Sequence, residues 1–472
     1  MKLSLNWIKD YVNIPADMDL TRLAYDLTMS TVEVEGAEQL ARRYDGIIVG
    51  IIREVLPHPN ADKLRICRTD IGGEEKEIVC GGSNLAVGQK VVVACPGAKV
   101  RWHGEGDLVE IKNAKLRGVE SYGMICAAVE IGMADLFPTE DDHAIVDLSA
   151  FDIEAGTPLA KALDLDDIIL EIDNKSMTNR PDLWGHYGIA REFATLAGRE
   201  LKPLETVDLS QYAGLPALDI KIENDDCLRY SGLKFDNVSV SVSPMNMRIR
   251  LFYCGMRGIN FLADLTNYLM LEMGQPMHAF SIETIKDSHI IVRNAREGET
   301  ITTLDGVERN LDPSMLVIAD PEKAVAIAGV MGGENTEVTD NTVDVFIESA
   351  YFQPTCVRRT STRLGLRSEA SIRFEKGINM DTVLTAAERA AQLMQLTGGG
   401  VVVGGAIDNY PTKHEAVTIE LALAKVNALL GTEISDEKIH EILKDKSDYD
   451  LKIILEAFVN HRINILGRLN RI

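Results

Sequence analysis

The chain of 472 residues is too long for a single hydrophobic core, and its length predicts roughly three or four domains. With 46% hydrophobic and 26% charged residues, its composition argues against a largely disordered chain. The net charge of −23 argues against sequence-blind binding of nucleic acid over the whole surface, but it is compatible with a local basic footprint.

The seven cysteines lie far apart in the sequence, and none forms a CxxC pair or a cluster with histidine. This pattern argues against a disulfide framework and a structural zinc site, so we expect a cytoplasmic protein with no metal ligands in its site. The first residues lack the apolar region of a signal peptide, and no apolar run reaches the roughly eighteen residues of a membrane span.

The N-terminal segment, residues 1–41, is predicted to be helical. Apolar side chains recur there at helical spacing and form two faces, Trp7, Ile8, Tyr11 and Val12 on one and Leu20, Leu23 and Leu27 on the other. From residue 42 to 150 the pattern is that of strands separated by turns, at Ile47–Ile52, Leu64–Thr69 and Val91–Ala94. Several short strands within about 110 residues predict a small β-barrel.

Residues 151–208 return to a helical pattern. The sequence Asn179-Arg180-Pro181-Asp182 predicts a turn, and an amphipathic helix follows it and ends near Gly198. We expect a structural role for this segment, and Arg180 is the one residue in it to test for contact with RNA or another subunit.

Residues 209–398 form a long region of mixed helix and strand. Within it, Glu348 stands in the apolar run VFIESA, where strand alternation directs a lone carboxylate into an apolar pocket. A helix over 381–396 is ended by glycines at 398–400. The glycine run at 398–405 lacks the Gly-Lys-Ser/Thr of a phosphate loop and follows a helix, so we interpret it as a helix stop before a strand.

The stretch 357–377 is strongly basic within this acidic chain. It carries five arginines and Lys376 against Glu369 and Glu375, the arginines being Arg358, Arg359, Arg363, Arg367 and Arg373. Composition leaves two interpretations open, a local RNA footprint and a solvated basic face.

The last part of the chain, 399–472, is expected to be a partial module. It predicts a strand at 417–419, a helix over 422–431, and a second helix for which Ser435 is the N-cap. Residues 446–472 fit a weak helix or a weak strand equally well.

Several strings resemble a known family. Leu265-Thr266-Asn267-Tyr268, Gln275–Phe280, Gly329–Gly333 and Gly365–Ser371 resemble the editing domain of the β subunit of bacterial phenylalanyl-tRNA synthetase. HPNADKL (58–64) and KLRGVESYGMICA (115–127) resemble the tRNA-binding OB-fold appended to several synthetases. The resemblance ends near Asp445, so we expect either a truncated chain or a changed reading frame.

The resemblance implies an α+β multidomain fold. It comprises an N-terminal region (1–41 and 151–208) with an inserted OB-fold barrel (42–150), a mixed α/β editing domain (209–398) and a partial C-terminal α/β module (399–472). The implied function is tRNA binding and hydrolysis of tyrosyl-tRNA(Phe), while the α subunit of an α₂β₂ heterotetramer carries aminoacylation. ATP and Mg²⁺ are implied for that holoenzyme, none for this chain alone, and no membrane is involved.

The resemblance also assigns roles to individual residues. His278, Asn267 and Ser368 match the catalytic residues near the aminoacyl ester and its water. Editing-pocket roles fall to five residues, Glu348 for the tyrosyl hydroxyl, Ala370 for pocket size, Gly332 and Pro276 for the wall, and Arg257 near the tRNA terminus. The residues expected to bind tRNA are Lys63, Lys115 and Arg117.

Each assignment has a structural alternative. His278 fits a core or capping histidine, Glu348 an ion-pair partner of an arginine in 358–373, and Asn267 a turn residue. Ala370 and Gly332 fit close packing, and Arg257 fits a surface salt bridge. For the whole chain, the alternatives are a non-catalytic tRNA-binding or scaffold protein with a relict editing domain, and a free-standing editing hydrolase.

Overall fold

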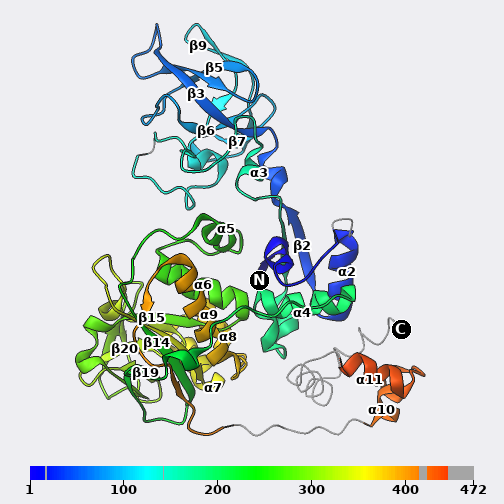
Figure 1. Ribbon diagram of the computed structural model, residues 1–472, viewed down its shortest axis with the longest axis vertical. Helices are drawn as coiled ribbons and strands as arrows, with labels where there is room; N and C mark the ends of the chain where they lie inside the picture. Colours follow the sequence, from blue (N-terminus) through cyan, green and yellow to red (C-terminus); the bar gives the residue numbers. More distant parts are fainter. Residues whose placement is uncertain (16–18, 142, 414–421, 445–472) are drawn as a thin grey trace.

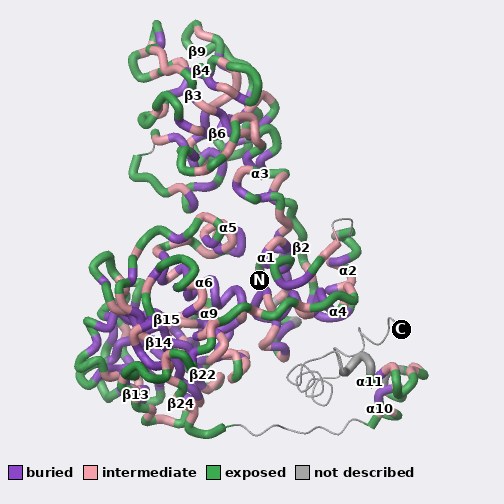
Figure 2. The backbone as a smooth tube through the Cα atoms, in the orientation of Figure 1, coloured by how far each residue is buried: buried purple, intermediate pink, exposed green. Residues whose placement is uncertain are grey.

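The computed structural model describes residues 1–472 except 16–18, 142, 414–421 and 445–472. The architecture mixes α and β structure, as the sequence predicts. Along the longest axis, a barrel-like sheet lies at one end, a small N-terminal sheet in the middle and a larger two-sheet region at the other end (Figure 1). Figure 2 shows buried residues concentrated inside the two-sheet region and along the strands of the barrel-like sheet.

A three-stranded antiparallel sheet joins two segments that are distant in sequence. Its strands, in spatial order, are β1 (Lys2–Ser4), β12 (Ile168–Ile172) and β2 (Val34–Gln39). The helices of this part are α1 (Leu5–Lys9), α2 (Leu20–Ser30) and α4 (His186–Ala197). The expectation of helices over 1–41 and 151–208 is wrong for these three strands. Strand β2 could not be read from the sequence because this edge strand is mostly exposed and lacks the apolar alternation that marks a strand.

The predicted helix stop and turn are present around α4. Gly198 caps the helix at φ 60°, in the left-handed region that glycine adopts without strain. In the preceding turn the buried Arg180 donates hydrogen bonds to Asp182 and Glu192, at 2.7 to 2.9 Å. This ion network favours the structural role expected for the turn.

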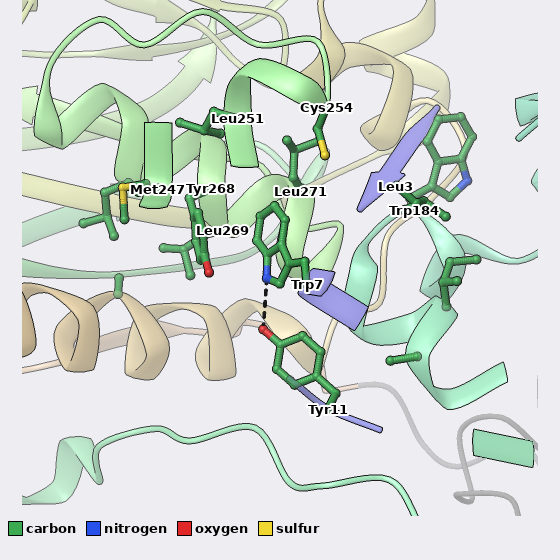
Figure 3. Close-up of a cluster of buried hydrophobic side chains, with 14 of the residues drawn as sticks. Leu3, Trp7, Tyr11, Trp184, Met247, Leu251, Cys254, Tyr268, Leu269 and Leu271 are labelled. Atoms are coloured by element: carbon green, nitrogen blue, oxygen red, sulfur yellow. Dashed lines mark hydrogen bonds between the residues drawn. The ribbon is translucent and has the colours of Figure 1, made fainter. Parts of the chain in front are cut away.

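The N-terminal segment is anchored on α6 (Phe261–Met273) through aromatic packing (Figure 3). The Trp7 ring stacks on His186 at 4.0 Å and on Tyr268 at 4.3 Å, and its indole N–H donates to the Tyr11 hydroxyl at 3.3 Å. Tyr11 in turn donates to Glu272 on the same helix. These contacts fix the N-terminal segment to the C-terminal half of α6, the helix that precedes β15 (Met277–Ser281).

Residues 47–125 contain a five-stranded antiparallel sheet. In spatial order its strands are β11 (Met124–Ile125), β6 (Lys90–Ala94), β3 (Ile47–Pro57), β4 (Arg65–Asp70) and β5 (Glu75–Cys80). The two edge strands, β11 and β5, contact each other, so the sheet curls into a nearly closed barrel. Two hairpins and a short helix complete this part: β7 (Lys99–Arg101) with β8 (Leu108–Glu110), β9 (Ala114–Leu116) with β10 (Val119–Ser121), and α3 (Leu159–Ala162).

The larger region is built on the sheet β15–β22–β14–β23, with β24 also paired to β14. Its strands are β14 (Cys227–Asp236), β15 (Met277–Ser281), β22 (Val345–Phe352), β23 (Val401–Val402) and β24 (Ile407–Asn409). One face packs on α6 and α9 (Thr382–Thr397), with α5 (Met245–Tyr253) beside α6. Helix α9 ends at Gly398 and leads into β23, as predicted.

The other face of this sheet packs against a second sheet. Its strands, in spatial order, are β13 (Asp219–Ile222), β16 (His289–Asn294), β19 (Leu316–Ala319), β20 (Ala324–Ile327) and β21 (Met331–Gly332). A hairpin and two helices flank it: β17 (Thr300–Thr302) with β18 (Glu308–Asn310), α7 (Pro354–Leu364) and α8 (Glu369–Phe374). Tyr230, Phe280 and Phe346 enter this core, so strand alternation directs His278 and Glu348 to the same side.

The last described elements are α10 (Leu423–Leu430) and α11 (Asp436–Lys444), where the sequence predicts two helices. The Ser435 hydroxyl accepts a hydrogen bond from the Lys438 amide at 3.2 Å, as an N-cap does. The predicted strand at 417–419 and the tail 446–472 lie outside the described residues. Among the helices that the structure describes, none has the length and apolar character needed to cross a membrane.

Candidate functional site

A cavity of about 70 Å³ lies between the two packed sheets and α8. Five of the predicted site residues line it, and they come from four elements and a loop: Pro276, His278, Gly332, Glu348 and Ala370. Most of the remaining wall is apolar and includes Ile318, Ile327, Val330, Met331 and Phe374. The fold thus brings together in one small site residues that are up to nearly one hundred positions apart in the sequence.

Glu348 is the buried carboxylate of this site. It lies on the central strand β22, directly between Gly232 of β14 and His278 of β15, and is 5% exposed. Its Oε2 accepts a hydrogen bond from the Tyr230 hydroxyl at 2.6 Å. Burial raises the carboxyl pKa to about 7, against a smaller lowering by the Tyr230 hydrogen bond.

The ion-pair interpretation of Glu348 is wrong. Within the described ranges its carboxylate has no basic partner, and Tyr230 is its one hydrogen-bond donor. Glu348 lines the cavity, and the one hydrogen bond to its carboxylate among the described residues is on Oε2, so Oε1 can accept a hydrogen bond from a ligand.

His278 lies beside Glu348 on the same face of the sheet. Its Nε2 is buried and has no hydrogen-bond partner among the described residues, and its ring packs edge-on against Phe280 at 4.5 Å. Burial lowers the imidazole pKa to about 4, so the ring is neutral at pH 7. An unpaired buried nitrogen is costly and is unusual outside functional sites.

Two glycines allow the close packing around these side chains. A Cβ built on Gly332 would lie 2.5 Å from Cε1 and 2.7 Å from Nε2 of His278. A Cβ built on Gly232, opposite Glu348, would lie 2.3 Å from the Phe346 ring. A larger residue at Gly332 would displace His278, which lines the cavity, and one at Gly232 would displace Phe346, which stacks on Tyr230.

Helix α8 contributes Ala370 and is fixed by Ser368. The Ser368 hydroxyl donates to the carbonyl of Val330 at 2.7 Å and accepts from the Ser371 amide at 3.1 Å, as an N-cap. Since Val330 lines the cavity, this hydroxyl ties the wall before β21 to the start of α8. Ser368 itself does not line the cavity.

Two predicted residues lie away from the cavity. Asn267 is half-buried in the middle of α6, so its interpretation as a turn residue is wrong. Arg257 is exposed in the loop between α5 and α6. Neither lines the cavity.

The residues predicted to bind tRNA lie on the 58–64 loop and on the β9–β10 hairpin of the barrel region. Lys63, Lys115 and Arg117 are all exposed. The His58 ring forms a hydrogen bond with the carbonyl of Leu116 at 3.1 Å, and the Asn60 side chain donates to the carbonyl of Arg117 at 2.9 Å. These bonds bring the 58–64 loop against the β9–β10 hairpin, so the three cationic side chains share one part of the surface.

The basic stretch after β22 divides into two kinds of arginine. Arg373 is buried, with its partner Glu369 at 2.8 Å, whereas four arginines are exposed: Arg358, Arg359, Arg363 and Arg367. Arg363 pairs with Asp312 at 2.9 Å and Arg367 with Glu375 at 3.2 Å. The five arginines of this sequence stretch therefore do not form a single exposed face.

Sequence reasoning missed Tyr230, the hydrogen-bond partner of Glu348. These two residues are 118 positions apart and meet only because β14 pairs with β22. No local pattern signals such a contact. Over the described part of the chain, no group of three or more His, Cys, Asp or Glu side chains is arranged to hold a metal ion.

Two regions of the chain match family models of known proteins. Residues 226–399 match a family model described as a B3/4 domain, and residues 47–157 match one described as a tRNA binding domain. The phenylalanine–tRNA ligase β subunit of Moorella thermoacetica is 43% identical over 448 residues, which is 94% of this chain and 54% of that protein. The β subunit of Oceanobacillus iheyensis is 40% identical over 456 residues, 95% of this chain and 55% of that protein.

The chain therefore spans about half the length of the curated relatives it matches. Among solved structures, an N-terminal fragment of the phenylalanyl-tRNA synthetase β subunit from Pyrococcus horikoshii is 18% identical and covers 59% of this chain and 77% of the fragment. Its TM-score of 0.29 is too low to carry an argument about the fold.

Proposed function

We propose, because the chain belongs to the family of phenylalanine–tRNA ligase β subunits, that it binds tRNA and hydrolyses tyrosine from mischarged tRNA(Phe). The observation that carries this proposal is that one apolar cavity brings together the buried carboxyl of Glu348 and the imidazole of His278, whose Nε2 has no hydrogen-bond partner among the described residues. Aminoacylation falls to an α subunit in an α₂β₂ heterotetramer. ATP and Mg²⁺ serve that reaction and not the hydrolysis that we assign to this chain.

The domain division supports the same function. We propose that the barrel within 42–150 is an OB-fold that holds tRNA, and that 209–398 is the editing domain. Segments 1–41 and 151–208 join these parts through the sheet β1–β12–β2, and 399–472 is a partial further module. We also propose a cytoplasmic location, supported by the similarity to subunits of a tRNA ligase.

The cavity suits a phenol better than a phenyl ring. A site that hydrogen-bonds a hydroxyl rejects the analogue without it by about 10⁴-fold, because the buried polar group is then left unpaired. Glu348 provides that acceptor, and the small Ala370 leaves room beside it. Since a cavity of roughly 150 Å³ accommodates benzene, ring entry into the present 70 Å³ requires the wall to shift, and the unbranched Met331 is suited to that.

Hydrolysis needs a water held at the ester carbonyl. We propose that the neutral imidazole of His278 accepts a hydrogen bond from this water and orients it. The water oxygen attacks the carbonyl carbon, the bond to the ribose oxygen breaks, and a proton passes to that oxygen. The products are free tyrosine and a tRNA with a free terminal hydroxyl.

The remaining predicted residues act around this centre. Pro276 and Gly332 form the wall, and Ser368 positions α8 through the Val330 carbonyl. We assign Asn267 and Arg257 to the RNA end of the substrate, because neither lines the cavity. Lys63, Lys115 and Arg117 bind tRNA phosphates further away.

The decisive assay follows ester loss from tyrosyl-tRNA(Phe) and phenylalanyl-tRNA(Phe), with and without α subunit. Faster loss of the tyrosyl ester, abolished in Glu348→Ala and His278→Ala, supports the proposal. Activity without α identifies a free-standing hydrolase. If neither ester is hydrolysed even in the presence of α subunit, the proposed hydrolase activity is wrong, and a non-catalytic tRNA-binding protein remains.

A further inference from the structure

A fully buried tyrosine lies behind the carboxyl that the proposed function uses. Tyr230 on β14 is 0% exposed and lies two residues before Gly232, which is directly opposite Glu348. Because Gly232 has no side chain, the Phe346 ring occupies the space above it and stacks parallel to the Tyr230 ring, at 6.4 Å and 5°. The Tyr230 ring is thereby held in one orientation, with its hydroxyl 2.6 Å from Glu348 Oε2.

We propose that Tyr230 is a positioning residue for Glu348: it occupies Oε2, so that Oε1 is the oxygen presented to the hydroxyl of a phenolic substrate. This inference rests on the proposed function and adds to it a residue that determines specificity. A carboxylate that accepts a hydrogen bond from one fixed hydroxyl is held in a single orientation. An acceptor held in this way distinguishes a substrate with a hydroxyl from one without it better than a freely rotating acceptor does.

Among the described residues, Tyr230 is the one placed to hold the Glu348 carboxyl in this way. Besides Tyr230, the titratable groups near Glu348 are His278 on β15 and Cys227 on β14. Neither forms a hydrogen bond with the carboxyl in the described part of the chain, and burial raises the pKa of the Cys227 thiol, which keeps it neutral. The Tyr230 bond also opposes the rise in the pKa of Glu348 that burial causes.

The hydroxyl therefore favours the ionised, better-accepting form of Glu348. Without it, the carboxyl would hold its proton to higher pH and could itself turn donor. A substrate hydroxyl would then meet a protonated, freely rotating group.

The experiment removes only the hydroxyl, with Tyr230→Phe. Its first readout is a ¹³C NMR titration of glutamate-labelled protein, in which the Glu348 signal is identified by its absence in Glu348→Gln. We expect the titration midpoint to move up by at least one pH unit. The second readout is hydrolysis of tyrosyl-tRNA(Phe), for which we expect kcat/KM at pH 7 to fall about 10- to 100-fold, with partial recovery at pH 9.

The matched control is Tyr253→Phe, which removes another buried hydroxyl, hydrogen-bonded to Tyr44 at 2.5 Å. It is expected to change neither readout. In a Glu348→Gln background, Tyr230→Phe is expected to cause no further loss, because Tyr230 acts through the carboxyl.

An unchanged midpoint together with an unchanged pH profile would overturn the inference and leave Tyr230 as packing. Failure of the proposed function is a different result: the wild-type protein would not hydrolyse the ester even with α subunit. In that case the Glu348 titration still decides whether Tyr230 sets the state of the carboxyl.

Discussion

The cavity around Glu348 and the basic surface of the barrel differ in how far water reaches their ionisable side chains. In the cavity, the Glu348 carboxyl and the Nε2 atom of His278 are buried. Burial raises the pKa of the carboxyl to about 7 and lowers the pKa of the imidazole to about 4. On the barrel, Lys63, Lys115 and Arg117 are exposed to water. A single polar contact is worth far more where water is excluded than where it is present.

This difference predicts different responses to mutation and salt. In the cavity, one substitution should have a large effect that hardly depends on ionic strength. On the barrel surface, each charge should contribute little, the contributions should add, and salt should screen them.

The largest expected effect is that of His278→Ala on hydrolysis of tyrosyl-tRNA(Phe). Loss of the group that orients the water should lower kcat by about 10²- to 10⁴-fold, equally at low and at high salt. The control is His289→Gln, which alters a histidine paired with Asp219 at the edge of the second sheet and should leave the rate unchanged. If raising the salt concentration slowed the wild-type protein as much as the substitution does, His278 would act in RNA binding and not in orienting the water.

The second effect concerns stability and tests the burial of Glu348 directly. Its folded pKa of about 7 lies above the ordinary value of 4.5, so between these pH values the unfolded chain loses a proton that the folded protein keeps. The contribution of this group to the free energy of unfolding therefore falls as the pH rises from 4.5 to 7. Above pH 7 the total loss is on the order of 3 kcal/mol.

Glu348→Gln removes this titration. Relative to the wild type, the free energy of unfolding of the variant should therefore increase from pH 4.5 to pH 8, as measured by urea unfolding. Glu308→Gln, at an exposed position of β18, should show no such trend. Parallel curves for Glu348→Gln and wild type would mean that water reaches the carboxyl.

The sequence predicted the residues of the cavity better than their contacts. Alternation in VFIESA predicted that Glu348 points into an apolar environment, and the buried carboxyl on β22 has that setting. The glycine stop at Gly398 and the three barrel strands were likewise readable, because capping and period-two patterns are local.

What sequence reasoning could not supply depends on strand pairing. Tyr230 meets Glu348 through the register of β14 with β22, and Gly332 meets His278 through the packing of one sheet on another. Strand β2 was missed because an exposed edge strand shows no apolar alternation. The positions of Asn267 and Arg257 away from the cavity were equally invisible in the sequence.

A smaller effect is expected for Gly332→Ala. The added methyl would lie 2.5 Å from the His278 ring, so either the ring or β21 must shift. We expect a stability loss of about 1 to 3 kcal/mol and slower hydrolysis, measured by thermal unfolding and single-turnover rates. Gly214→Ala is the matched control, because its Cβ would meet nothing within 4 Å. Unchanged hydrolysis would show that the ring position in the free protein does not matter to the reaction.

The smallest effect for each residue is expected on the barrel surface, for Lys63→Gln, Lys115→Gln and Arg117→Gln. Each phosphate contact contributes roughly 0.7 to 0.9 to the slope of log affinity against log salt, so the triple variant should lose about 2 to 3 of that slope. Its tRNA affinity should fall most at low salt, measured by filter binding over a salt series. Arg53→Gln, an exposed arginine of β3 already paired with Asp70 at 2.7 Å, is the control. If the triple variant instead lowered the single-turnover rate at saturating tRNA, these residues would help to align the substrate in the cavity. Binding by the barrel and hydrolysis in the cavity would then not be independent.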